Sequence, residues 1–115
     1  MAPSKATSSV NFFLDGNFAP VSEERDASDM EIRGSIPKDL AGHFLRVGPN
    51  PVHIFSEQAY HTFDGDGMIN AFRFDGDYLH HRGALVITKR FTAEQEAGRY
   101  LWNGFGTSFD DARAV

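Results

Sequence analysis

The sequence predicts an all-β fold built on an antiparallel sheet. Between residues 60 and 88, runs of alternating apolar and polar residues are separated by Asp-Gly sequences at 64–67 and 75–77. A period of two is typical of half-buried strands, and Asp-Gly between two such runs is the strongest short-range hairpin signal. Eleven Phe, three Tyr and one Trp indicate a largely aromatic core. We therefore expect strands at 60–63 and 68–74, and one or two more within 78–88.

The residues before this region predict a tail, an arm and a loop. Residues 1–10 are small and polar, which predicts a disordered tail. Residues 11–21 carry apolar side chains around the turn formers Asp15-Gly16-Asn17, so we expect an ordered arm that lies on another part of the protein. The acidic stretch 22–29 is expected to be a solvated loop.

Two short strands and a helical turn are expected between residues 30 and 51. Residues 30–34 alternate like a strand, and residues 36–40 resemble one helical turn opened by Pro37. Residues 43–47 alternate again, and the sequence Gly-Pro-Asn-Pro at 48–51 ends that strand because prolines cannot donate to a sheet. This corner either positions the first strands or shapes access to a substrate, and the first interpretation is favoured.

One short helix is expected within residues 92–102. Thr92 and Gln95 have the spacing of a capping box, and the residues from Ala93 to Ala97 are helix formers. Gly98 weakens the pattern, so the helix should have two to three turns.

Composition excludes several classes of function. The net charge is −5 and no run of Lys or Arg is present, which argues against nucleic acid as a partner. The chain has no Cys, so disulfides and thiolate chemistry are excluded. No apolar stretch approaches the roughly 18–20 residues that span a bilayer, and the start does not resemble a secretory signal. A cytoplasmic location is favoured, an organelle is not excluded, and membrane association is left open.

Two segments resemble the carotenoid oxygenase family. Residues 34–51 read GSIPKDLAGHFLRVGPNP and residues 60–69 read YHTFDGDGMI. The arm at 16–21 and the stretch 88–99 are also similar, so the resemblance extends over about residues 11–106. It implies a seven-bladed β-propeller with non-haem Fe(II) on its axis, held by four histidines. Such enzymes use dioxygen to cleave a carbon–carbon double bond in a carotenoid, apocarotenoid or stilbene-like substrate.

This resemblance predicts a partial β-propeller with an N-terminal arm and one short helix. A blade takes about 40–50 residues, so 115 residues supply at most about two. We therefore expect residues 11–115 to be the amino-terminal, incomplete part of the propeller domain of an iron-dependent dioxygenase. The alternatives are a truncated, non-catalytic remnant, a member acting on stilbene-like substrates, and a member that isomerises rather than cleaves.

No residue of this chain is assigned to catalysis, cofactor binding or metal binding. In the family the iron ligands lie further downstream, so none of the histidines inherits that role; they are His43, His53, His61, His80 and His81. His61 is interpreted as structural, and neighbours in a strand such as His80 and His81 point to opposite faces. Fe(II) is expected in the complete enzyme and not in this part alone.

Two further motifs are interpreted as structural. The sequence Asp-Gly-Asp-Gly at 64–67 is expected to form a tight turn, because the residues after it lack the remaining oxygen ligands of a calcium loop. Phe63, Phe72 and Phe74 have the spacing of one strand face, which favours core packing over substrate contact.

Overall fold

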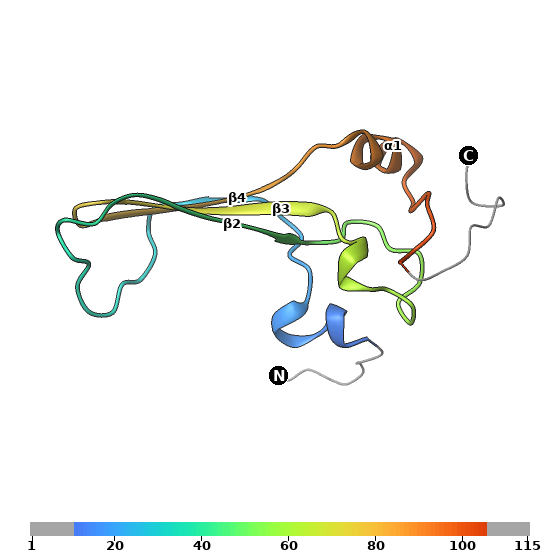
Figure 1. Ribbon diagram of the computed structural model, residues 1–115, viewed down its shortest axis with the longest axis horizontal. Helices are drawn as coiled ribbons and strands as arrows, with labels where there is room; N and C mark the ends of the chain where they lie inside the picture. Colours follow the sequence, from blue (N-terminus) through green and yellow to red (C-terminus); the bar gives the residue numbers. More distant parts are fainter. Residues whose placement is uncertain (1–10, 106–115) are drawn as a thin grey trace. The chain divides into compact units, whose positions relative to one another are not determined.

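The computed structural model of the protein describes residues 11–105, so the expected tail at 1–10 lies outside the described residues (Figure 1). Contacts divide the described chain into two compact units that alternate along the sequence. The first unit contains residues up to 22, residues 49–66 and residues from 87 onward. The second contains residues 23–48 and 67–86.

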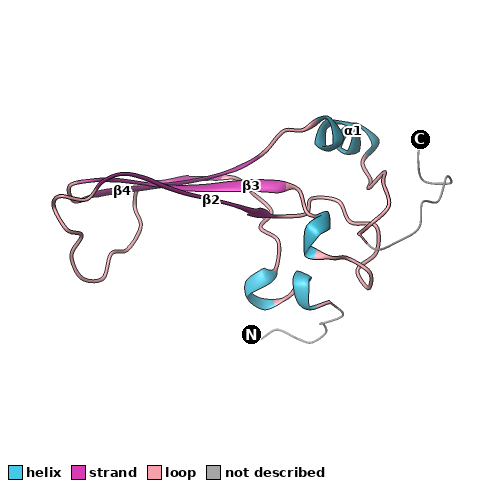
Figure 2. Cartoon of the chain, in the orientation of Figure 1, coloured by secondary structure: helices cyan, strands magenta, loops and turns pink. Residues whose placement is uncertain are grey.

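The second unit is a four-stranded antiparallel sheet with the strand order β1-β4-β3-β2. Its strands are drawn in magenta in Figure 2. Its strands are β1 (Arg25–Ala27), β2 (Ala41–Pro49), β3 (Gly67–Asp75) and β4 (Tyr78–Leu85). Four antiparallel strands are the usual content of one propeller blade. The predicted all-β class is confirmed.

The β3–β4 hairpin forms where the sequence predicts it. Asp75 pairs with Tyr78, so Gly76 and Asp77 make a two-residue loop. Gly76 has a φ of 64°, a left-handed conformation that glycine adopts without strain. The ladder continues to Met68 opposite Leu85, and only one strand occupies the region after the turn.

Strand β1 lies in the stretch that the sequence predicts to be a loop. Asp26 pairs with Arg82 in the antiparallel β1–β4 ladder, and its carboxylate also contacts the ring of His80. The carboxylate of Glu24 accepts the backbone N–H of Leu85 at 2.8 Å. The expected loop at 22–29 is wrong at residues 25–27, because a pairing with such a distant segment leaves no local pattern. The expected strand at 30–34 is also wrong, since these residues form no strand.

Strand β2 confirms the strand expected at 43–47 and extends it to 41–49. Before it, residues 36–40 form a single turn closed by a bond from the N–H of Leu40 to the carbonyl of Pro37, rather than a turn of helix. Phe44, Leu45 and Val47 are more than half exposed, at 54%, 57% and 71%. Strand β2 therefore buries little apolar surface within the described chain.

In the first unit, the arm forms two short 3-10 helices, η1 (Phe12–Leu14) and η2 (Gly16–Phe18). The side chain of Asn11 caps η1 and also donates to the carbonyl oxygens of Glu57 at 2.9 Å and Tyr60 at 2.7 Å. The expected ordered arm is confirmed, and Asn11 is the residue that anchors its start.

The strand expected at 60–63 is wrong, and so is the hairpin turn after it. The segment instead forms the 3-10 helix η3 (Thr62–Asp64), with His61 as its N-cap. The ring of His61 accepts the N–H of Phe63 at 3.0 Å, while Asp64 accepts the N–H of His61 at 3.2 Å. This capping box satisfies two backbone donors locally, which favours helix over strand. Phe63 is 72% exposed and belongs to no strand face.

The expected helix is present as α1 (Lys89–Ala97), but it begins earlier than the sequence predicts. Thr88 rather than Thr92 is its N-cap, and the Thr88 hydroxyl accepts the N–H of Phe91 at 3.0 Å. Gly98 ends the helix in a left-handed conformation with a φ of 70°. None of the described helices has the length and apolar character required to cross a membrane.

Candidate functional site

The most distinctive feature of the first unit is a buried polar network. It consists of Asn50, Asp64, Asp66 and Glu94, which are each at most 9% exposed. Burying carboxylates without partners is strongly unfavourable, so each must be hydrogen-bonded. These residues come from three segments that lie far apart in the sequence, and their bonds hold those segments together.

Asp64 joins η3 to the end of the described chain. One oxygen of its carboxylate takes part in the His61 capping box, and the other accepts the backbone N–H of Phe105 at 2.7 Å. Its backbone carbonyl accepts a bond from the guanidinium of Arg90 at 2.9 Å. A Cβ on Gly104 would approach Asp64 Oδ2 to 3.1 Å, so the chain passes very close to this carboxylate.

Asn50 and Asp66 join the Gly-Pro-Asn-Pro corner to its neighbours. The carboxamide of Asn50 accepts the N–H of Val21 at 2.8 Å and donates to the Val21 carbonyl at 3.1 Å. The N–H of Asn50 donates to the carbonyl of Asp66 at 2.6 Å, and Asp66 Oδ2 accepts the N–H of Val52 at 3.0 Å. The corner is thereby bound both to the arm and to the Asp-Gly-Asp-Gly segment.

Glu94 and Arg90 connect helix α1 to this network. Glu94 is 1% exposed, and its carboxylate accepts from Arg90 Nε at 3.3 Å and from the N–H of Leu101 at 3.2 Å. The Arg90 guanidinium also lies over the ring of Tyr100, 5.0 Å from its centroid. The two hallmark segments that carry the family resemblance, residues 34–51 and 60–69, do not include this pair, although an Arg and a Glu four residues apart on a helix are a recognisable signal.

Tyr60 lies beside the two buried aspartates and is 7% exposed. Burial raises the pKa of its phenol to about 12, with further increases from the charges of Asp64 and Asp66 and a smaller opposing effect from Arg90. The phenol therefore stays neutral at physiological pH. Such a group can pack and hydrogen-bond, but it is a poor base.

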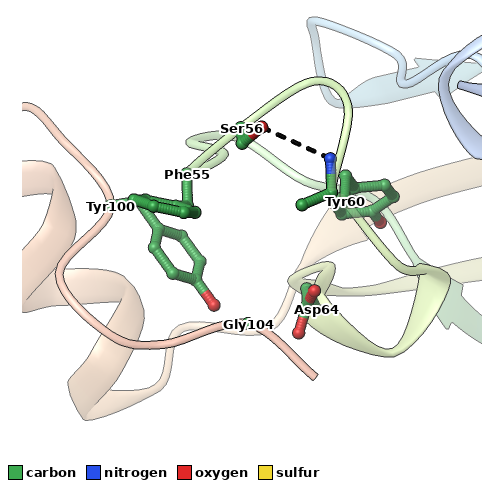
Figure 3. A pocket seen from close by; sticks show the side chains of 7 residues that line it. Phe55, Ser56, Tyr60, Asp64, Tyr100 and Gly104 are labelled. Atoms are coloured by element: carbon green, nitrogen blue, oxygen red, sulfur yellow. Dashed lines mark hydrogen bonds between the residues drawn. The ribbon is translucent and has the colours of Figure 1, made fainter. Parts of the chain in front are cut away.

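A small pocket opens next to this network (Figure 3). Phe55 and Tyr100 line one side of it, and Tyr60 and Asp64 line the other. The loop that carries Phe55 is held by a bond from the N–H of Ala59 to the hydroxyl of Ser56 at 3.3 Å. The bonds described for the carboxylates of the network go mainly to backbone N–H groups, which indicates that the network positions segments of chain rather than performing proton transfer.

The five histidines lie in separate local environments. His43 is exposed in β2, and His61 caps η3. The ring of His53 bonds to Gln95 at 2.8 Å, and that of His81 bonds to Asn70 at 2.9 Å. The fifth, His80, contacts Asp26. Within residues 11–105, no three His, Asp or Glu side chains gather into a group that could hold a metal ion. The described residues therefore do not fit the iron that the resemblance implies.

Comparison with known proteins shows the family. A family model described as RPE65, retinal pigment epithelial membrane protein, matches residues 18–114. The chain therefore belongs to this family, the RPE65 or carotenoid oxygenase family, and the resemblance found in the sequence is confirmed. It is 42% identical over 88 residues to carotenoid 9,10(9',10')-cleavage dioxygenase 1 of Phaseolus vulgaris, covering 76% of this chain and 16% of that protein. It is 37% identical over 108 residues to apocarotenoid-15,15'-oxygenase of Synechocystis, covering 92% and 22%.

Solved structures agree with this assignment. The lignostilbene dioxygenase of Pseudomonas brassicacearum superposes with a TM-score of 0.77 and 28% identity, over 89% of this chain and 22% of that one. A cobalt-substituted apocarotenoid oxygenase of Synechocystis gives a TM-score of 0.67 and 38% identity, over 74% and 18%. The cobalt form indicates a metal cofactor in the family. The chain spans only about a fifth of the length of the relatives that it matches.

Proposed function

We propose that this chain is the amino-terminal segment of a non-haem Fe(II)-dependent dioxygenase that cleaves carbon–carbon double bonds of carotenoids or apocarotenoids. The observation that carries the proposal is family membership over residues 18–114, together with relatives that are carotenoid and apocarotenoid cleavage enzymes. A stilbene-like substrate is the alternative, and the similarity to a lignostilbene dioxygenase supports it.

In this proposal the described residues build a scaffold, and the rest of the protein supplies the iron ligands. The polar network supports a scaffolding role, because the bonds of Asp64 with Arg90 and with Phe105 link segments more than 25 residues apart. When bound, the iron would activate dioxygen for attack on the double bond. Four imidazoles suit Fe(II), and they must converge from separate elements of a closed ring of blades.

A second candidate is a non-catalytic remnant that retains the fold of one blade. The five histidines of the described chain, which offer no metal site of their own, agree with this candidate as well as with the first. The two candidates differ in the codons that come after Val115 in the gene. A reading frame that continues with at least four further histidines in strand-like sequence supports the enzyme, whereas a stop codon directly after Val115 contradicts it.

The direct test is turnover by the product of the complete gene. We expect that protein, loaded with Fe(II), to consume oxygen and release two carbonyl products from an apocarotenal. The same assay with a hydroxylated stilbene separates the two substrate classes. Failure of the iron-loaded protein to cleave either compound would overturn the proposed activity.

A further inference from the structure

Strand β2 forms one edge of the four-stranded sheet. It stands at the end of the strand order, so within residues 11–105 no further strand pairs with its outer edge. The opposite edge strand, β1, has three residues, whereas β2 has nine. An edge strand presents backbone N–H and C=O groups with which another strand can pair, and a long edge is the better template. The outer edge of β2 therefore fits an extended strand as its partner.

The side chains of β2 do not protect this edge. Lys side chains, prolines within the strand and covering segments commonly keep sheet edges from pairing with other chains. Residues 43–47, which lie between Gly42 and Gly48, contain neither Lys nor Pro. In this segment Phe44, Leu45 and Val47 are more than half exposed. Their apolar surface gains from being covered, because its removal from water is favourable.

The sequence of this segment is complementary to itself. If two copies pair antiparallel about a two-fold axis at Leu45, this residue lies opposite the same residue of the other copy. Phe44 then lies opposite Arg46, and His43 lies opposite Val47. Aliphatic pairs and a guanidinium beside an aromatic ring are favourable cross-strand contacts, and no two basic side chains face each other. A pairing centred on Arg46 would instead oppose two guanidinium groups, which is destabilising.

The same register joins one face of the two sheets. The ring of Phe44 lies 6.4 Å from that of Phe72 in β3, and Phe72 is stacked on His81 of β4 at 4.6 Å. Opposite residues of an antiparallel pair lie on the same face, so the rings of Phe44 and Phe72 from both copies would line one continuous surface. A contact of this kind uses the same residues of both copies and closes after two of them.

We propose that β2 is a self-association edge, through which two copies of this chain pair antiparallel around Leu45 and join their four-stranded sheets into one. The partner is a second copy because the backbone edge requires a strand and the register satisfies both copies at once. The contact is small, so the dimer should be weak, with a Kd of about 10–100 μM. It involves neither iron nor oxygen, and it is independent of the proposed function.

The test is sedimentation equilibrium of the full 115-residue chain at concentrations from about tenfold below to about tenfold above this Kd. We expect a monomer–dimer equilibrium. Leu45→Lys and Leu45→Glu each place two like charges at the two-fold axis and should weaken association at least about tenfold. An equimolar mixture of these two variants places Lys opposite Glu and should restore the dimer.

The matched control is Ile87→Lys. Ile87 is an apolar residue that is 66% exposed and lies outside the four strands, so its substitution should leave the Kd within about twofold of the wild type. A monomeric wild-type chain at the highest concentration, undiminished association of both Leu45 variants, or a mixture that stays monomeric would each overturn the proposal. A different partner strand would give the first of these results.

A cross-linking measurement keeps the test decisive if a charge at position 45 perturbs the fold. The chain has no Cys, so Leu45→Cys introduces one thiol at the two-fold axis. The two Cβ atoms of an opposite pair lie about 4.5–5.5 Å apart, close to the spacing of a disulfide. Under mild oxidation Leu45→Cys should form a covalent dimer at least about tenfold faster than Ile87→Cys. Equal rates in these two variants would contradict the β2 pairing.

Discussion

At the scale of single residues, Gly65 lies where the first unit leaves no room for a side chain. A Cβ there would lie 2.7 Å from the Tyr60 hydroxyl, 2.8 Å from Pro49 Cβ and 3.0 Å from the backbone N of Asn50. Two of these neighbours belong to the Gly-Pro-Asn-Pro corner, which cannot shift without breaking its own bonds. We expect Gly65→Ala to lower the free energy of unfolding by about 1–3 kcal/mol in urea denaturation, as other overpacked sites do.

The matched control for this prediction is Gly48→Ala. Gly48 lies in β2, and no heavy atom would come within 4 Å of an added Cβ. Its substitution should change stability by less than about 1 kcal/mol, with a gain from reduced freedom of the unfolded chain. Equal effects of the two substitutions would show that close packing at Gly65 is not the reason that glycine is required.

The raised pKa of Tyr60 predicts that the protein loses stability in alkaline solution. Its folded pKa is about 12 and the ordinary value is 10, so the folded state favours the neutral phenol. The raised pKa therefore contributes about 2–3 kcal/mol to the free energy of unfolding. This contribution is fully present below pH 10 and disappears as the pH rises towards 12. Denaturation between pH 9 and 12 should show this fall, and Tyr60→Phe should remove it. Tyr78→Phe, at a 45% exposed position, should leave the fall unchanged; persistence of the full slope in Tyr60→Phe would contradict the prediction.

At individual positions, the sequence pattern located the important residues better than it explained them. It placed Asp64 and Asp66 in a hallmark segment and predicted that they form a tight turn. In the structure both are buried, and their carboxylates accept backbone N–H groups. Asp and Gly are the usual residues of exposed turns, so their burial depends on segments such as 50–52 and 105 that local pattern does not reveal. The motif around His61 predicted a structural role, and the position of His61 as a cap gives a physical reason for it.

At the scale of elements, the sequence predicted best what is local. The β3–β4 hairpin depends on two neighbouring strands and a two-residue loop, and it forms at the predicted turn. Strand β1 pairs with residues more than 50 positions away, so no local pattern predicts it. The strand expected at 60–63 is replaced by η3, which the His61 cap stabilises. The alternating run at 60–63 is only four residues long, which is too short for alternation alone to distinguish a strand from a short helix.

Helix α1 provides a test of where its cap lies. Both Thr88 and Thr92 precede helix formers, but only the Thr88 hydroxyl accepts the N–H of Phe91 in the described structure, while Thr92 lies within the helix and is exposed. We expect Thr88→Ala to destabilise the protein by about 1 kcal/mol in thermal or urea unfolding. Thr92→Ala should be neutral or slightly stabilising, because Ala is the better helix former. If Thr92→Ala were instead the more destabilising substitution, the N-cap would be Thr92, as the sequence alone predicts.

At the scale of the whole molecule, the family assignment depends on motifs, whereas the site depends on residues beyond them. The two hallmark segments at 34–51 and 60–69 were sufficient to predict the family, since their order and spacing are specific. They contribute the corner, the capping box and the buried aspartates, but not Arg90 and Glu94, which complete the network from helix α1.

The dispersal of the histidines predicts the metal content of this chain. They are distributed over β2, the N-cap of η3, β4 and the loop before residue 60, and within the described residues no three potential ligands converge. Iron held by imidazoles requires several rings at about 2 Å from one point, so an isolated or paired ring should bind Fe(II) weakly. We expect the 115-residue chain, incubated with Fe(II) without oxygen and then passed through a desalting column, to retain well below one iron per chain by elemental analysis. His61→Ala should leave the iron content unchanged. Retention of one Fe(II) per chain that is lost in His61→Ala would contradict the prediction. It would mean that His61 is an iron ligand and that this chain contributes to the metal site as well as to the scaffold.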